Sequence, residues 1–322
     1  MTPAATLFDP VPIRAVGAQL RAARFPADPA VPGRGVLVLL NGQTEFIEKY
    51  FEVIDELRGR GFAVATLDWR GQGGSSRALT DDSRKGYVSD FSEYEDDLDT
   101  LMNWIVTPML QEYEARLPAR AATAIRPVAL AHSMGGHILL RYLLKRPASF
   151  GPCVLAAPMI AVSFRGQREW LVRAVTAWQM RRKRAGGWVW GMEARDPHNV
   201  TFATQLVTSD AQRFERTQAL LRENPDLRLA GATWGWLHAA LRSMDWLKTR
   251  ATDVKTPLLI VGAGADRICI TPATRAFAAR VPNGSYVEIA GAGHEMMMER
   301  NEIRAQFWDA FDAFMEKHRA SV

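Results

Sequence analysis

Short apolar runs alternate with stretches of helical periodicity along most of the chain. Val36–Leu40 (VLVLL) is apolar at every position, which is typical of a strand buried on both faces of a sheet. Similar runs occur at 63–67, 128–131, 154–157, 258–262 and 286–289, and helical patterns at 46–60, 91–106, 134–146 and 300–318. This alternation predicts an α/β fold with a mostly parallel central sheet flanked by helices. An antiparallel edge hairpin is expected around residues 19–25.

The alternation stops between residues 160 and 248. This segment has helical periodicity, many tryptophans and no convincing strand. We therefore expect a helical cap, or lid, at 160–248, inserted into a core domain formed by 1–159 and 249–322.

Composition points to an ordinary globular protein. Apolar residues make up 48% of the 322 residues and charged residues 23%. No run of roughly 18 apolar residues predicts a membrane span, and residues 1–16 lack the pattern of a secretory signal. Two cysteines are too few for a disulfide framework. We expect a cytoplasmic protein, at most peripheral at the inner face of the membrane.

The segment 131–136 (AHSMGG) joins a predicted strand to a predicted helix. This context is that of a nucleophile elbow, in which a serine stands on a sharp turn between small residues. Ser133 is the expected nucleophile, with Gly135 two residues after it and Ala131 two residues before it. The helix that follows directs its positive end toward this serine. The alternative is a chance serine in a glycine-rich turn.

A serine nucleophile needs a base and a carboxylate that orients the base. In folds with this elbow the chain order is serine, acid, histidine. Asp266 is the first carboxylate after the strand at 258–262, and His294 lies in a glycine-rich loop after the strand at 286–289. Asp266 could instead cap the next helix, although Thr271 can serve there, and His294 could be an exposed loop histidine.

The oxyanion of an acyl-transfer intermediate needs two backbone donors. We expect the amides of Gln43, in the loop after Val36–Leu40, and of Met134, at the start of the helix. Glu45 either braces this loop or is a solvated surface charge.

These residues resemble a known family. Asn41-Gly42, the segment 68–73 (DWRGQG), the Ser133 elbow, Asp266 and His294 occur in the order of the serine-aminopeptidase-type, or monoacylglycerol-lipase-like, branch of α/β hydrolases. The stretches 41–50, 130–136 and 155–159 are especially similar to bacterial lysophospholipases of the L2 type. The resemblance implies the α/β-hydrolase fold with a cap inserted near Pro158. Many relatives carry His-Gly at 41–42 and Gly at 131, so these two positions depart from the pattern.

The insertion carries the features that bear on substrate and partners. Within 167–184 an apolar stripe with two tryptophans faces away from several arginines, and the segment ends in a basic run. The stripe either packs on the core, or the region Arg165–Arg184 contacts an anionic membrane. Four tryptophans are candidates to line an acyl channel, or are core residues: Trp188, Trp190, Trp234 and Trp236.

The predicted function is hydrolysis of a carboxylic ester of a lipid-like substrate, a lysophospholipid or a monoacylglycerol, through an acyl-enzyme. A small-ester carboxylesterase, an amidase or peptidase with the same triad, and an inactive binding scaffold are the alternatives. No dinucleotide or nucleotide-binding motif is present, and the acidic residues at 93–99 spread around a helix start, so no cofactor and no metal are expected. Despite the net charge of +5, no nucleic-acid partner is expected.

Overall fold

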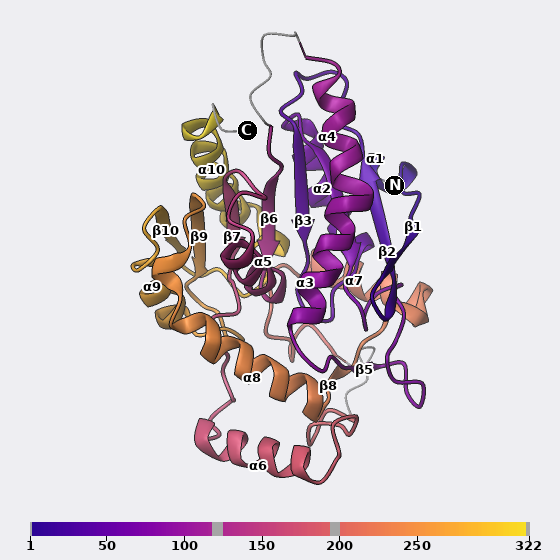
Figure 1. The fold of residues 1–322 in the computed structure, drawn as a ribbon, viewed down its shortest axis with the longest axis vertical. Coiled ribbons are helices and arrows are strands. Elements are labelled where there is room, and N and C mark those ends of the chain that lie inside the picture. The colour runs from indigo at the N-terminus through magenta and orange to yellow at the C-terminus, as the bar shows by residue number, and fades with distance from the viewer. Residues whose placement is uncertain (1, 118–124, 194–199, 320–322) are drawn as a thin grey trace.

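The centre of the molecule is an eight-stranded sheet in the order β1-β2-β4-β3-β6-β7-β9-β10 (Figure 1). The computed structural model describes residues 2–117, 125–193 and 200–319. Strands β4, β3, β6, β7, β9 and β10 run parallel to one another, and β2, next to the edge strand β1, runs antiparallel to both β1 and β4. The predicted fold class is therefore confirmed. The strands are β1 (Val11–Ala15), β2 (Ala18–Phe25), β3 (Val36–Leu40), β4 (Ala63–Asp68), β6 (Val128–His132), β7 (Cys153–Ala156), β9 (Leu258–Ala263) and β10 (Gly284–Ile289).

Helices cover both faces of this sheet. In β3, Val36, Val38 and Leu40 belong to one core cluster, whereas Leu37 and Leu39 belong to the other. The first cluster includes residues of α3, α5 and α8, and the second includes residues of α2 and α10. The helices are α1 (Pro3–Thr6), α2 (Phe51–Gly59), α3 (Ser92–Leu101), α4 (Thr107–Glu114), α5 (Met134–Lys145), α6 (Glu169–Arg181), α7 (Ala211–Glu223), α8 (Trp234–Lys248), α9 (Thr271–Ala278) and α10 (Asn301–Lys317).

Element boundaries differ from the sequence expectations in three places. The helix expected over 46–60 begins as a 3-10 turn, Ile47–Tyr50, before α2. The helix expected over 91–106 continues through a π-type turn, Met102–Val106, into α4. The edge hairpin, expected around residues 19–25, comprises β1 and β2 and so begins earlier in the chain. The sequence does not predict β1 because this strand is mostly exposed and carries little apolar alternation.

Residues 160–248 leave the sheet after β7 and return at β9, its neighbour in the sheet. They contain α6, α7 and α8, and α6 lies at one end of the molecule, beyond α8 (Figure 1). The expectation of no strand here is wrong in one detail. A two-residue strand, β8 (Gly231–Ala232), pairs in parallel with β5 (Lys85–Gly86), and such a short pairing leaves no periodic signal in the sequence.

A partly buried carboxylate on α2 attaches α7 to the rest of the molecule. Glu52 accepts bonds from Arg213 at 2.6 Å and Arg216 at 2.6 Å, both on α7, and pairs with Arg304 of α10 at 3.2 Å. Burial alone would raise the pKa of Glu52, but the three arginines outweigh it and lower the pKa to about 2. One carboxylate therefore joins three helices at neutral pH.

The first turn of α5 lies against the end of β3 at van der Waals distance. A Cβ placed on Gly135 would lie 2.5 Å from the Asn41 carbonyl oxygen and 2.6 Å from that of Leu40. One obstacle is a backbone atom of the last residue of β3 and the other of the residue that follows, so neither can move without a shift of the main chain. The requirement for a small residue at this position is thus steric.

We expect Gly135→Ala to lower the free energy of unfolding by about 2–3 kcal/mol, because overpacking against backbone costs that much. Gly59→Ala is the matched control. A Cβ on Gly59 meets nothing within 4 Å, and alanine in a helix is favoured over glycine by about 0.5–1 kcal/mol. Urea unfolding measures both variants, and equal effects in the two would contradict the steric explanation.

Candidate active site

Ser133 stands on a strained turn between β6 and α5. Its φ of 50° and ψ of −114° lie in a region that residues other than glycine rarely adopt. The Ser133 amide donates to the Ala156 carbonyl at 3.0 Å, and the Ser133 carbonyl accepts from the amides of His137 at 3.1 Å and Met159 at 3.0 Å. These three bonds tie both ends of the strained peptide to neighbouring elements.

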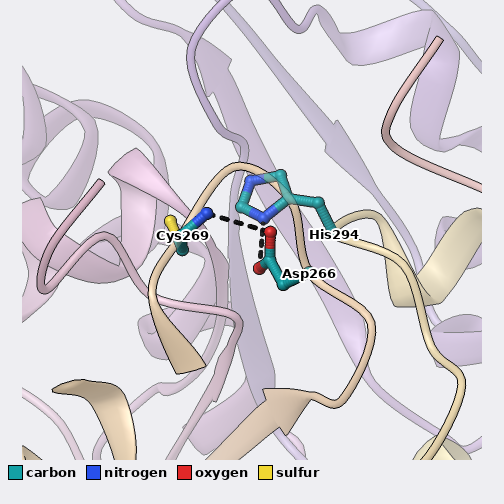
Figure 2. A group of neighbouring side chains, drawn as sticks. All are labelled: Asp266, Cys269 and His294. Atoms are coloured by element: carbon teal, nitrogen blue, oxygen red, sulfur yellow. Dashed lines mark hydrogen bonds and ion pairs between the residues drawn. The ribbon is translucent and has the colours of Figure 1, made fainter. Parts of the chain in front are cut away.

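The structure brings together the three residues that the sequence predicts as a triad. His294 Nε2 lies 2.9 Å from Ser133 Oγ, and His294 Nδ1 lies 2.7 Å from Asp266 Oδ2. Figure 2 shows the Asp266 carboxylate directed at the His294 ring, and the Asp266 Oδ1 atom accepts from the amides of Ile268 at 2.7 Å and Cys269 at 2.9 Å. This geometry allows His294 to take the proton of the serine hydroxyl.

Asp266 does not cap α9, which was the alternative for this residue. The helix begins at Thr271, its N-cap position is Ile270, and no side chain accepts a bond there. The Thr271 hydroxyl donates instead to the Ala263 carbonyl at 2.6 Å. The Asp266 carboxylate thus accepts hydrogen bonds from the amides of its own loop and from His294.

Cys269 also lies at this site, although no sequence pattern predicts it there. Asp266, Cys269 and His294 each offer one metal-ligating atom within 4.8 Å of the others (Figure 2). The imidazole and the carboxylate are already bonded to each other, however. Burial raises the pKa of the Cys269 thiol well above 9, and the Asp266 carboxylate adds to this. The arrangement is therefore a hydrogen-bonded pair beside a neutral thiol.

The two expected oxyanion donors have free amides. Within the described residues, neither the Gln43 amide nor the Met134 amide donates a hydrogen bond. The neighbouring Gly42 amide, by contrast, donates to the Glu45 carboxylate. The loop 41–43 is further fixed by Trp69 Nε1, which donates to the Asn41 carbonyl at 2.9 Å, and by Gln72 Nε2, which donates to the Gly42 carbonyl at 2.7 Å. The segment 68–73 thus supports the loop.

Glu45 is buried, with 3% of its surface exposed, so the reading of this residue as a surface charge is wrong. Its carboxylate accepts bonds from Lys49 Nζ at 2.8 Å, from the Tyr50 hydroxyl at 2.7 Å and from His132 Nδ1 at 2.9 Å. Sequence spacing could have suggested the Lys49 pair, because residues four apart meet on a helix. The contact with His132 has no local signal.

A cavity of about 450 Å³ lies beside these loops. Its lining includes Thr44, Ile268 and Glu295, which follow the oxyanion loop, the acid and the base in sequence. The apolar part of the lining comes mainly from the insertion: Val200, Leu206, Val207, Phe214, Leu221 and Leu229. No sequence motif marks these six residues, because they lie in a segment whose packing the hydrophobic pattern does not reveal.

None of the four candidate tryptophans lines that cavity. Trp188, Trp190 and Trp234 line a second hollow of about 670 Å³, together with Lys85 and Lys183. Trp236 is buried in the core, where its Nε1 donates to the Tyr94 hydroxyl at 3.2 Å. The structure therefore separates these residues into a surface hollow and the core, and does not gather them into one channel at the triad.

A second serine–histidine contact provides an internal comparison. His137 Nε2 lies 2.6 Å from Ser243 Oγ, but His137 Nδ1 faces the Met159 carbonyl at 2.8 Å in place of a carboxylate. Burial lowers the pKa of His137 to about 3. This ring has no anion to stabilise the imidazolium that forms when a base takes a proton. Ser243 therefore lacks the activation that the Ser133 site offers.

Comparison with known proteins agrees with this geometry. The family model described as "Serine aminopeptidase, S33" matches residues 32–301, which is most of the chain. Lysophospholipase L2 of Escherichia coli K12 is 28% identical over 293 residues, covering 88% of this chain and 81% of that protein. A probable lysophospholipase L2 of Haemophilus influenzae is 25% identical over 283 residues, covering 88% and 84%.

Two solved structures have the same fold. A soluble variant of monoglyceride lipase from Saccharomyces cerevisiae, in complex with a substrate analog, superposes with a TM-score of 0.73 at 18% identity, covering 96% of this chain and 94% of that one. A thermostable carboxyl esterase from Bacillus coagulans has a TM-score of 0.71 at 15% identity, covering 97% and 98%. At such identities the likeness shows the fold alone.

We expect a fluorophosphonate probe to label Ser133, because its hydroxyl bonds to a histidine that is itself bonded to a carboxylate. Ser133→Ala should retain the fold by circular dichroism and lose the label. Asp266→Asn should slow labelling by about 10³-fold or more, since an amide selects the wrong imidazole tautomer. Ser243→Ala is the matched control and should label like the wild type. An unlabelled wild type would instead favour an inactive scaffold.

Proposed function

The chain belongs to the serine aminopeptidase S33 family, has the α/β-hydrolase fold and is a serine hydrolase, and we propose that its substrate is a carboxylic ester of a lysophospholipid or a monoacylglycerol. The observation that carries this proposal is a cavity of about 450 Å³ that is lined by apolar and polar side chains alike, among them Thr44, Ile268 and Glu295 from the oxyanion loop, the Asp266 loop and the His294 loop. Cavities of about 300–1,000 Å³ suit small organic ligands, and the apolar side chains of this lining can contact an acyl chain. Relatives named as lysophospholipases support the lipid character of the ester.

The proposed reaction has two steps. Ser133 attacks the ester carbonyl while His294 Nε2 takes the hydroxyl proton, and the Asp266 carboxylate stabilises the resulting imidazolium. The Gln43 and Met134 amides hold the oxyanion of the tetrahedral intermediate. The ester C–O bond then breaks while His294 gives its proton to the leaving oxygen, so the alcohol is released and the acyl group remains on Ser133. Water, activated by His294, hydrolyses the acyl group and restores Ser133.

The insertion 160–248 is proposed to act as a cap that selects the acyl chain. Helix α7 contributes Phe214, Thr217 and Leu221 to the cavity, and the loop before it contributes Leu206 and Val207. These side chains face the loops that bear the triad, so an acyl chain bound at Ser133 would extend between cap and core.

Helix α6 is proposed to contact an anionic membrane. Trp170 is 63% exposed and Trp178 is 45% exposed, whereas the polar side chains of Thr176 and Gln179 are buried. The helix therefore presents large apolar side chains to solvent although two of its polar residues are buried, which departs from the pattern of an ordinary surface helix. The exposed cations around it are Arg165, Arg168, Arg181, Arg182, Lys183 and Arg184. Tryptophan at headgroup depth and cations beside phosphates are the features of interfacial binding. No helix within the described residues is both long and apolar enough to span a bilayer.

We expect kcat/KM on p-nitrophenyl esters to rise with acyl length until the cavity is filled. Each buried methylene contributes about 0.8 kcal/mol, which is about fourfold in kcat/KM. Leu206→Trp should abolish this increase and spare the acetate, because the larger side chain fills the cavity. Val16→Trp, at a position that is 79% exposed, is the control.

A second experiment compares substrate classes in a panel of lysophospholipids, monoacylglycerols and aminoacyl anilides. Anilide turnover above ester turnover would favour a peptidase, and a preference for acetate would favour a small-ester esterase.

We expect the protein to sediment with phosphatidylglycerol vesicles and not with phosphatidylcholine vesicles, with salt weakening the binding. Trp170→Ala/Trp178→Ala should weaken vesicle binding by at least about tenfold, because two interfacial rings are lost. Trp104→Ala is the matched control, since Trp104 is 67% exposed on another element. Equal effects of the two changes would argue against a specific role for α6.

A further inference from the structure

Glu45 is the centre of a buried cluster that contacts the oxyanion loop, the nucleophile elbow and the loop that bears His294. Its carboxylate accepts the Gly42 amide from the oxyanion loop, and Oε2 also lies 2.9 Å from Nδ1 of His132, the residue before the nucleophile. The other ring nitrogen of that histidine, Nε2, lies 3.1 Å from the backbone carbonyl oxygen of His294. A single carboxylate and a single imidazole thus connect the nucleophile, the base and the oxyanion donors.

The partners of His132 determine its charge. A carboxylate and a backbone carbonyl can only accept hydrogen bonds, so both contacts are satisfied together only when both ring nitrogens carry protons. The proton cannot rest on Glu45 instead, because that carboxylate already accepts from Gly42, Lys49 and Tyr50. His132 is therefore an imidazolium ion, although it is 2% exposed.

The charges around His132 balance. Lys49 Nζ bonds to Glu45 at 2.8 Å and to Glu295 at 2.6 Å, so two carboxylates face two cations. Burial alone would lower the pKa of His132, but the adjacent Glu45 carboxylate outweighs it and raises that pKa above 6.5. Burial and the Glu45 carboxylate raise the pKa of Tyr50 well above 10, and the two glutamates raise that of Lys49 despite its burial. In this cluster, His132 is thus the first cation to lose its proton as pH rises.

We propose that Glu45 and protonated His132 are positioning residues that hold the His294 loop and the oxyanion loop in place around Ser133, so that turnover requires the proton on His132. When one proton is lost, the other stays on Nδ1, because a hydrogen bond to the charged Glu45 carboxylate is stronger than one to a neutral carbonyl, so the His294 carbonyl loses its donor on His132. The His294 backbone then loses its bond to the nucleophile elbow, and the base is no longer held at Ser133 Oγ. This inference rests on the proposed ester hydrolysis for its kinetic test only.

The neighbouring His137 shows that this charge is not a general property of buried histidines here. Its Nδ1 donates to the Met159 carbonyl, while its Nε2 faces the Ser243 hydroxyl, which can donate as well as accept. One proton satisfies both contacts, so His137 is neutral, and burial lowers its pKa to about 3. The two histidines lie on either side of the elbow and differ in charge because their partners differ.

We expect kcat for a soluble ester to fall on the alkaline side as His132 loses its proton, at a pH above about 6.5. A raised pKa in the folded protein means that the stabilisation by His132 is complete below about pH 6.5 and is lost as pH rises through the raised value. His132→Gln supplies a single uncharged donor group. It should lower the plateau of kcat by about tenfold with little change in KM, and the alkaline limb should disappear.

Two further variants separate positioning from simple damage. Glu45→Gln removes the anion that favours the imidazolium, so the alkaline limb should move toward lower pH by about one unit or more. His137→Gln is the matched control, and should keep the alkaline limb where the wild type has it. A limb that persists unchanged in both His132→Gln and Glu45→Gln would overturn the proposal.

The charge of His132 can be measured without turnover. In Ser133→Ala protein with 15N-labelled histidine, NMR at about pH 7 should show protons on both ring nitrogens of His132, with His132→Gln providing the assignment. A wild type that hydrolyses no ester would refute the proposed function and leave this measurement intact. A singly protonated His132 in an enzyme that hydrolyses esters would refute the present inference.

Discussion

The close approach between the end of β3 and the first turn of α5 is the constraint on which the site depends. The register of β3 against β6, with Leu40 opposite Ala131, brings the loop after β3 against the elbow. A Cβ on Gly42 would lie 3.2 Å from that of Ser133, and one on Gly135 would meet the β3 backbone. Glycine at both positions lets the loop that carries the free Gln43 amide approach the serine. The strained φ of Ser133 is maintained because neighbouring elements hold both sides of its peptide.

Features with a local signal could be predicted from the sequence. The five apolar residues of β3 are buried on alternate faces, as their unbroken pattern predicts. Ser133, Asp266 and His294 each follow a strand, and the carboxyl ends of parallel strands meet at one edge of a sheet, so their proximity also follows from local patterns. The burial of single side chains outside these regular elements, by contrast, has no local signal in the sequence. The sequence could not decide whether Glu45 is a brace or a surface charge, and it could not show that the tryptophans of α6 face solvent.

His132 illustrates a different limit of sequence reasoning. A histidine next to the nucleophile is too close in sequence to act as its base, and on that ground it attracts no interest. Its two hydrogen-bond partners are Glu45 and His294, which are 87 and 162 residues away. The charge of a buried imidazole depends on both partners at once, because only two acceptors together require two protons. Neither partner is visible from the residues that flank His132, and the same holds for the neutral His137.

The insertion is anchored unevenly, and this bears on how a lipid could reach the serine. Helix α7 is tied to α2 and α10 through Glu52, whose partners Arg213 and Arg304 have side chains that are 13% and 6% exposed. Helix α6 is joined to α8 by Arg173 and Asp245, whose side chains are 32% and 52% exposed, and such exposed pairs stabilise little. The cavity wall formed by α7 is therefore fixed to the core by partly buried charge. The ion pair that joins α6 to α8 is more exposed than these pairs, so salt screens it more strongly than the pairs of Glu52.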